Sequence, residues 1–316
     1  MATSSRPAPA RKHVLALYGP TASGKTAVAS ILRDRLGVDV ISADSAALYA
    51  GLPVLTAAPP YPARLVGTVP LDQDVSVGSY QRLAHAAIDE SDRPLVVGGT
   101  GLYLRAALAD FDIPPAGERR AFWEAEYDRL SGESAHALLA ERDPQAAGRV
   151  HPNDRKRVVR ALELAEVGAS LAPAANRLWT DDTRLPTTLV ALDVPLDELD
   201  RRIEARTKKM VELGVVDEAR AAWARPLART ASHVLGLEEF ATLPVDQAVD
   251  KVTHSTRRLA RYQRKWLRRL PAAVTLDGTR PVEELADEIV ALERSGEHLP
   301  RHGGEPADRG GRAGGG

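Results

Sequence analysis

The sequence predicts an α/β fold in which helices flank a doubly wound parallel sheet, with an all-helical insertion domain. Short, nearly continuous apolar runs alternate with helical patterns, and such runs are typical of parallel strands that are buried on both faces. A glycine-rich loop joins the first apolar run to the first helical pattern. Residues 118–167 contain no convincing strand and indicate helices only.

The predicted elements follow one another in a regular order. We expect strands at residues 14–18, 38–42, 94–97, 188–192 and 272–276. We expect helices at 27–36, at 122–130, 134–141 and 153–167 in the insertion, across 196–270 with breaks near Pro226 and Pro244, and at 282–292. The domains that follow are a core at 13–115 and 184–293, an insertion at 116–183, and disordered tails at 1–12 and 294–316.

Composition limits the classes of function. The chain has 316 residues, of which 44% are apolar, so it can bury a large core. Its formal net charge of −1 argues against a globally basic nucleic-acid binder, so such a role needs segregated charge. The absence of cysteine excludes disulfides, thiol nucleophiles and cysteine-bound zinc. No apolar run approaches membrane-spanning length and no secretory signal is visible, so we expect a cytoplasmic protein without a membrane partner. We also expect a monomer.

The loop after the first strand fits the phosphate-binding pattern G-x-x-x-x-G-K-S/T, the P-loop. Its glycines let successive backbone N–H groups turn inward, and the following helix adds its partial positive charge. A lysine in this pattern adds a mobile charge, and the last hydroxyl can hold Mg²⁺. The loop consists of Gly19, Pro20, Thr21, Ala22, Ser23, Gly24, Lys25 and Thr26.

Two polar side chains follow neighbouring strands. Asp44 closes the second strand and Thr100 closes the third, within Gly98-Gly99-Thr100-Gly101. Because the carboxyl ends of parallel strands open into one crevice, both should lie near the phosphate loop. Asp44 is either a general base or merely a helix cap or metal ligand. Thr100 either contacts a ligand or caps the next helix.

Basic residues gather in two segments. Lys156, Arg157 and Arg160 open the last helix of the insertion, and there a nucleic-acid surface and a solvated, acid-paired face are equally plausible. Residues 256–269 carry seven cations without an acid, which favours contact with RNA or polyphosphate. We expect the apolar residues of this second segment to form its buried stripe, namely Leu259, Tyr262, Trp266 and Leu270.

Together these segments resemble the tRNA dimethylallyltransferases, also called tRNA isopentenyltransferases. The resemblance rests on five blocks, which stand in family order and span nearly the whole folded chain. The blocks are GPTASGKT at 19–26, ISADSAALYAGL at 41–52, the GGTGLY block at 94–108, HPNDRKRVVRALEL at 151–164 and TRRLARYQRKWLR at 256–268.

The resemblance implies transfer of a dimethylallyl group from dimethylallyl diphosphate to N6 of the adenosine that is 3′-adjacent to the anticodon of a tRNA. Asp44 matches the family's catalytic base, and Thr100 matches a position that contacts the accepting base. Lys25, the rest of the loop and Mg²⁺ would hold the diphosphate, with Arg225 as a further contact. The implied tRNA-binding residues are Asp44, Ser45, Ala46, Ala47, Thr100, Arg120, Lys156, Arg157, Arg160, Arg261, Gln263, Arg264 and Arg268.

Three other functions share parts of this pattern. A prenyltransferase that acts on free adenine nucleotides needs neither the insertion nor the two basic segments. A small-molecule kinase has the same loop but consumes ATP. An RNA-binding protein gated by a nucleoside triphosphate shows salt-dependent RNA affinity and makes no product.

Overall fold

The computed structural model describes residues 12–110, 119–171, 182–270 and 273–295. These residues form two compact units, one from residues 1–110 and 181–316 and the other from 111–180. The expected core and insertion met at 116 and 183, so the observed limits lie a few residues earlier at both ends.

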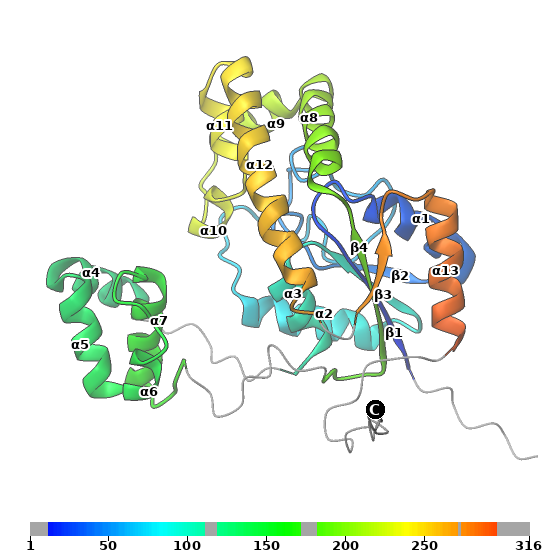
Figure 1. Ribbon diagram of the computed structural model, residues 1–316. Helices are drawn as coiled ribbons and strands as arrows, with labels where there is room; N and C mark the ends of the chain where they lie inside the picture. Colours follow the sequence, from blue (N-terminus) through cyan, green and yellow to red (C-terminus); the bar gives the residue numbers. More distant parts are fainter. Residues whose placement is uncertain (1–11, 111–118, 172–181, 271–272, 296–316) are drawn as a thin grey trace, which may run out of the picture. The chain divides into compact units, whose positions relative to one another are not determined.

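The first unit is built on a five-stranded parallel sheet with the order β2-β3-β1-β4-β5 (Figure 1). Leu15 in the central strand pairs with Leu95 of β3 on one side and with Thr188 of β4 on the other. The carboxyl ends of all strands therefore meet at one edge. The strands are β1 (Val14–Tyr18), β2 (Asp39–Ser42), β3 (Pro94–Gly98), β4 (Thr187–Asp193) and β5 (Val274–Asp277), each within two residues of its predicted limits.

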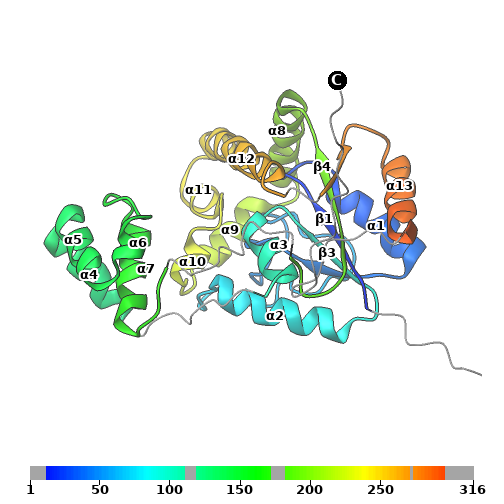
Figure 2. The ribbon, with the colours of Figure 1, turned by 60° about the horizontal axis from the view of Figure 1, so that its bottom comes forward.

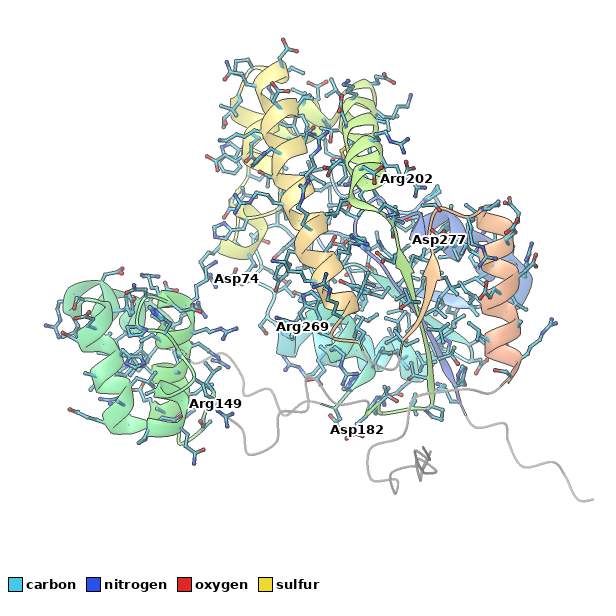
Figure 3. All side chains as sticks on the ribbon, viewed as in Figure 1. Asp74, Arg149, Asp182, Arg202, Arg269 and Asp277 are labelled. Carbon is cyan, nitrogen blue, oxygen red and sulfur yellow. The ribbon has the colours of Figure 1, made fainter. Side chains whose placement is uncertain are left out.

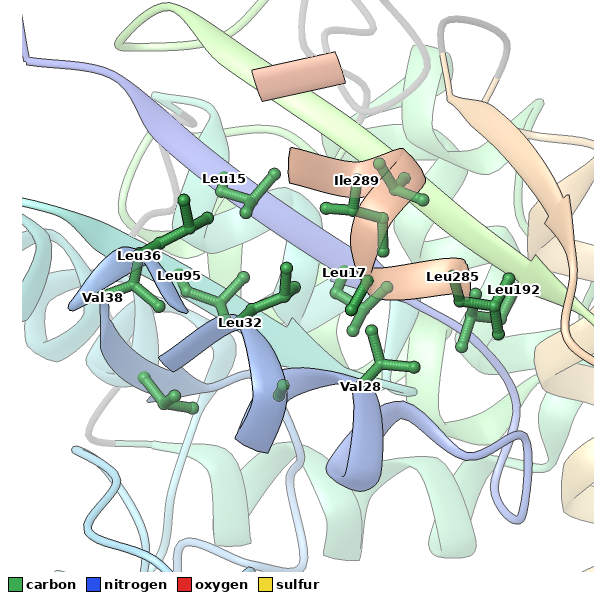
Figure 4. Packing of buried hydrophobic residues seen from close by; sticks show 14 of the residues in the cluster. Leu15, Leu17, Val28, Leu32, Leu36, Val38, Leu95, Leu192, Leu285 and Ile289 are labelled. Carbon is green, nitrogen blue, oxygen red and sulfur yellow. The ribbon is translucent and has the colours of Figure 1, made fainter. Parts of the chain in front are cut away.

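Helices cover both faces of this sheet. On one face, Leu15 and Leu17 of β1 pack with Leu32 of α1 (Lys25–Leu36) and Ile289 of α13 (Val282–Ser295) (Figure 4). The other face is covered by α2 (Val77–Glu90), α3 (Gly101–Leu108) and α12 (Val245–Leu267) (Figure 2). The described part of this unit also contains α8 (Leu196–Glu212), α9 (Val215–Trp223), α10 (Arg229–Ser232) and α11 (Leu237–Thr242).

The ends of the fold correct the expected tails. Helix α13 continues to Ser295, and Lys12 donates to the carbonyls of Ile88 and Asp89. The sequence predicts disordered tails at 1–12 and 294–316, and this prediction is wrong for Lys12, Arg294 and Ser295. The remaining residues of both tails lie outside the described residues. Helix α2, which the sequence patterns did not single out, begins with a reciprocal cap between Ser76 and Ser79.

The second unit contains only helices in its described part. They are α4 (Arg120–Leu130), α5 (Gly132–Arg142), α6 (Pro144–Ala147) and α7 (Arg155–Glu166). Trp123, Leu139, Val158 and Leu162 share one small core. The Asp154 side chain accepts from the N–H of Arg157 and so caps α7.

The chain leaves the first unit and returns to it at one place. The N–H of Arg184 donates to the carbonyl of Leu108 at 2.7 Å, which joins the end of α3 to the segment before β4. Arg184 also pairs with Asp89 of α2. None of the described helices combines the length and the apolar character that crossing a membrane needs.

Candidate phosphate-binding site

The loop between β1 and α1 has the backbone that an anion site requires. Gly24 has φ of +91°, a conformation that side chains rarely adopt. A Cβ on Gly19 would lie 2.6 Å from Ser23 Oγ, so the turn is too tight for a side chain. No side chain caps the first turn of α1, and that turn holds no acid. Its N–H groups and helix dipole therefore remain available to an anion.

Lys25 folds back over this loop. Its Nζ donates to the carbonyl of Pro20 at 2.7 Å and lies 3.4 Å from Ser23 Oγ. Burial, together with the like charge of Arg206, lowers the pKa of Lys25 to about 8 against the attraction of Asp44. The lowered pKa means that, in the free protein, the attraction of Asp44 does not offset the burial of the Lys25 charge.

Arg206 of α8 is a functional candidate that the sequence patterns missed. Its Nε is buried and has no hydrogen-bond partner among the described residues. Burial lowers the pKa of Arg206, although Asp44 opposes the shift. Two cations thus face one carboxylate, and the excess positive charge suits an anionic ligand. Arg202, one turn earlier on α8 and labelled in Figure 3, pairs with Glu198 at 2.5 Å and also donates to the carbonyl of Ala22 in the loop at 3.5 Å.

The sequence patterns do not single out Arg206. The buried stripe of α8 contains Leu199, Ile203, Thr207 and Met210. Thr207 takes the inward position next to Arg206, so the helical spacing does not mark Arg206 as inward-facing. Arg225, which had been expected to bind diphosphate, is exposed just beyond the end of α9. The arginines near the loop come instead from α8: Arg202 donates to the carbonyl of Ala22, and the charge of Arg206 acts on Lys25.

Asp44 and Thr100 lie at the carboxyl ends of β2 and β3, as expected. One oxygen of Asp44, Oδ1, accepts from the N–H groups of Ala46 at 2.9 Å and Ala47 at 3.4 Å. Within the described part of the chain, Oδ2 makes no hydrogen bond, so the carboxylate is oriented through one oxygen and open at the other. Thr100 Oγ1 lies 3.3 Å from Ser45 N and 3.4 Å from Ser45 Oγ.

The alternative reading of Thr100 as a helix cap is wrong. Thr100 occupies the position before α3, yet its side chain caps no N–H of that helix. Its hydroxyl instead joins the segment that carries Asp44. A carboxylate and two hydroxyls, those of Ser45 and Thr100, are thus gathered beside the phosphate loop.

The glycines around Thr100 are required by the protein's own packing. A Cβ on Gly98 would lie 2.2 Å from the carbonyl oxygen of Ala43, and one on Gly101 would lie 2.2 Å from the ring of Trp266. A Cβ on Gly99 would lie 2.8 Å from Gln263 Nε2. Close packing within the protein therefore explains these glycines.

The other expected site residues differ in exposure. Thr26 is exposed at the start of α1, and Ser45 and Ala46 are half-buried. Ala47 is only 6% exposed. Gln263 is 5% exposed, and its Oε1 accepts from the N–H of Thr21 in the phosphate loop. The side chains of Ala47 and Gln263 are therefore too deeply buried for the contact with tRNA that the sequence predicts.

Helix α12 buries a different stripe from the one predicted. Trp266 and Leu270 are buried, but Tyr262 is 56% exposed and Leu259 is 36% exposed. The inward positions are instead taken by smaller and polar residues, including Ala260 and Gln263. A helix that packs against a polar loop buries polar groups, which a pattern of apolar residues alone cannot reveal.

Three cations of α12 are paired, contrary to the expectation of an unpaired cluster. Arg261 pairs with Asp200 at 2.7 Å, Arg264 with Asp193 through two bonds of 2.6 and 3.0 Å, and Arg257 with Glu204 at 3.1 Å. The acids come from α8 and β4, far away in sequence. Exposed cations that form no ion pair with any described residue remain at Arg258, Lys265 and Arg268.

The basic residues of the second unit surround a buried acid. Glu163 is 2% exposed, and its Oε2 lies 3.4 Å from Arg160 and 3.8 Å from Arg120. Arg157 lies 3.4 Å from Asp154, the cap of its own helix. Lys156 is exposed, and no ion pair joins it to the described residues. Arg157 and Arg160 are thus paired with acids, whereas contact of this face with RNA stays a prediction.

Comparisons with known proteins agree on one family. Residues 47–270 match the model of a family described as IPP transferase. A tRNA dimethylallyltransferase of Kineococcus radiotolerans is 39% identical over 306 residues, which cover 88% of this chain and 96% of that protein. One from Streptomyces coelicolor is 37% identical and covers 87% and 93%, respectively.

Solved structures give the same picture. The full-length tRNA isopentenylpyrophosphate transferase of Bacillus halodurans is similar with a TM-score of 0.63 and 27% identity, covering 90% of this chain and 98% of that one. A eukaryotic dimethylallyltransferase acting on tRNA is similar with a TM-score of 0.72 and 20% identity, covering 92% and 81%. At that identity the second likeness bears on the fold alone.

Proposed function

Because the chain belongs to the IPP transferase family, we propose that it is a tRNA dimethylallyltransferase. It transfers a dimethylallyl group from dimethylallyl diphosphate to N6 of the adenosine 3′-adjacent to the anticodon, position 37 of the tRNA. The products are N6-isopentenyladenosine and diphosphate. The observation that carries the proposal is an uncapped phosphate loop at which the charges of Lys25 and Arg206 and the carboxylate of Asp44 act on one another.

The leaving group explains the cations. As the bond between the allylic carbon and oxygen breaks, its electron pair goes to the diphosphate, so negative charge builds on the leaving oxygens. Lys25, Arg206 and the uncapped N–H groups at the start of α1 are placed to stabilise that charge. A diphosphate also restores the charge on Lys25, because an anion beside a lysine raises its pKa.

The accepting group explains the carboxylate. The lone pair of the adenine amine is delocalised into the ring, so N6 is a poor nucleophile until its proton is removed. Asp44 takes that proton through Oδ2 as the new carbon–nitrogen bond forms, while Oδ1 stays bonded to Ala46 and Ala47. Thr100 and Ser45 offer hydroxyls beside it that can orient the base.

The adenosine must leave its stack to reach this crevice, as bases do in other enzymes that modify them. Arg258 and Lys265 on α12 and Arg268 just after it are exposed and form no ion pair with any described residue, so they are suited to the RNA backbone. In the second unit, Lys156 and the half-exposed Arg120 and Arg160 are suited to the same role. We propose that the enzyme does this as a cytoplasmic monomer.

The residues present would hold Mg²⁺ through one protein oxygen, the hydroxyl of Thr26, together with the diphosphate and water. No group of three or more acidic, histidine or cysteine side chains that could hold a metal is found among the described residues. Mg²⁺ is commonly held by one or two protein oxygens together with substrate phosphates and water, and the exposed Thr26 hydroxyl supplies such an oxygen. When bound, the ion would neutralise charge on the diphosphate.

The decisive experiment is mass spectrometry of nucleosides from tRNA that lacks the modification. The tRNA is incubated with the purified protein, dimethylallyl diphosphate and Mg²⁺, without ATP. We expect adenosine at one position to gain the mass of one isoprene unit, and we expect free AMP to be a poor acceptor. Lys25→Ala serves as the inactive control. If tRNA never gains this mass while ATP is hydrolysed or its terminal phosphate is transferred, the proposal fails and kinase chemistry replaces it.

A further inference from the structure

Gln263 occupies an unusual place for a glutamine on a basic helix. It lies on α12 between Tyr262 and Arg264, yet only 5% of it is exposed. Its side-chain Oε1 accepts the N–H of Thr21 at 2.7 Å. A buried amide bonded to the phosphate loop is poorly placed to reach RNA from this helix.

A second set of contacts holds Gln263 from the end of β1 and from the turn after β3. The hydroxyl of Tyr18, the last residue of β1, donates to the carbonyl of Gln263 at 2.8 Å and lies 3.3 Å from the carbonyl of Gly99. Gly99 is so close that a Cβ there would meet Gln263 Nε2 at 2.8 Å. Gln263 therefore lies between the phosphate loop after β1 and the turn after β3.

The bond to Thr21 has a consequence for the loop. The N–H of Thr21 is already used, so it is not available to a phosphate oxygen. The loop's capacity for anions then rests on the N–H groups that follow, at Gly24, Lys25 and Thr26, where α1 begins without a cap. Tethering Thr21 holds the first half of the loop still, and a preorganised loop binds its ligand at lower entropic cost.

We propose that Gln263 is a positioning residue of the phosphate loop, and that it does not contact RNA. Its side-chain amide holds Thr21 so that the second half of the loop is preformed for the diphosphate. The proposal rests on the proposed function only in naming diphosphate as the ligand of the loop.

The test replaces the amide by an apolar side chain of similar size, Gln263→Leu. Thr253→Val is the matched control, because Thr253 is buried on the same helix and its hydroxyl has no hydrogen-bond partner among the described residues. Binding of inorganic pyrophosphate with Mg²⁺ is measured by calorimetry, and binding of tRNA by filter retention. The KM for dimethylallyl diphosphate, kcat and the exchange rate of the loop amides complete the set.

We expect Gln263→Leu to weaken pyrophosphate binding by about three- to tenfold, the range for one lost hydrogen bond. The KM for dimethylallyl diphosphate should rise similarly, with little change in kcat, and the Thr21 amide should exchange faster. The Kd for tRNA and the behaviour of Thr253→Val should stay at the wild-type level. If Gln263→Leu does not fold, Gln263→Met keeps the unbranched length and carries the same expectation.

Two results would overturn the inference. The first is weaker tRNA binding with unchanged pyrophosphate binding, which would make Gln263 an RNA contact. The second is an unchanged pyrophosphate affinity with unchanged exchange at Thr21, which would show that the tether does not shape the loop. Pyrophosphate binding does not require prenyl transfer. If Gln263→Leu weakens pyrophosphate binding as expected but the wild-type protein modifies no tRNA, the proposed function is rejected and this inference stands.

Discussion

The substitution Arg206→Met should make the free protein more stable and its diphosphate site weaker. The Nε of Arg206 is buried without a hydrogen-bond partner among the described residues. Burial lowers the pKa of Arg206 despite the nearby Asp44, so the fold holds this charge at a net cost. Methionine has a similar length and no charge, so it removes that cost and leaves the packing of α8 almost unchanged.

The magnitudes follow from the groups involved. Relieving one unsatisfied buried donor should add about 1–3 kcal/mol to the free energy of unfolding. A hydrogen bond to a charged group contributes about 1.5–3 kcal/mol, so pyrophosphate affinity should fall about ten- to a hundredfold. The pKa of Lys25 should also rise in this variant, because Arg206 is one of the groups that lowers it.

Urea denaturation and calorimetry with pyrophosphate measure the two opposite effects. Arg201→Met is the matched control, because Arg201 lies on the same helix, is exposed and pairs with Glu198. A surface pair of this kind contributes about 0–1 kcal/mol, so the control should change neither quantity much. A variant at position 206 that is less stable than wild type and still binds pyrophosphate normally would refute the reasoning.

Three further predictions concern titration, the base and the second unit. Since the pKa of Lys25 is about 8 in the fold and 10.5 when unperturbed, the unfolded chain binds more protons between these values, so stability should rise with pH across that window. Affinity for an unreactive thiodiphosphate analogue of the donor should fall above pH 8, whereas the weaker binding of Lys25→Met should not vary there. Asp44→Asn keeps the acceptor for Ala46 and should slow single-turnover transfer by about 10²–10⁴ with tRNA binding nearly intact; equal losses in both would make Asp44 a binding residue. Glu163→Gln should destabilise the second unit by about 1–3 kcal/mol, measured by urea denaturation, because Arg120 and Arg160 lose a charged acceptor; an unchanged transition would mean that this buried acid carries no net stabilisation.

The sheet could be predicted because its signal is local. Residues 14–18 form a strand with the predicted limits, and the other four strands begin or end within two residues of expectation. Buried parallel strands are continuous apolar runs, which need no knowledge of distant residues. Helix α2 was not singled out, since its pattern follows a loop-rich stretch.

The site could be predicted only in part, because its charges are balanced over long distances. The loop, Asp44 and Thr100 are all where strand order places them. The partners of Arg261 and Arg264 are not, because Asp200 and Asp193 belong to other elements. Arg206 was missed for the same reason: only the fold shows that its helix faces the phosphate loop.

The hydrogen bond between Arg184 and Leu108 means that the all-helical segment enters and exits through one narrow neck. A linker of a few residues could join Leu108 to Arg184 directly. The sheet and its covering helices would then form one continuous chain without the helical segment. The chain of the sheet-bearing unit is therefore continuous in its connectivity without the helical unit.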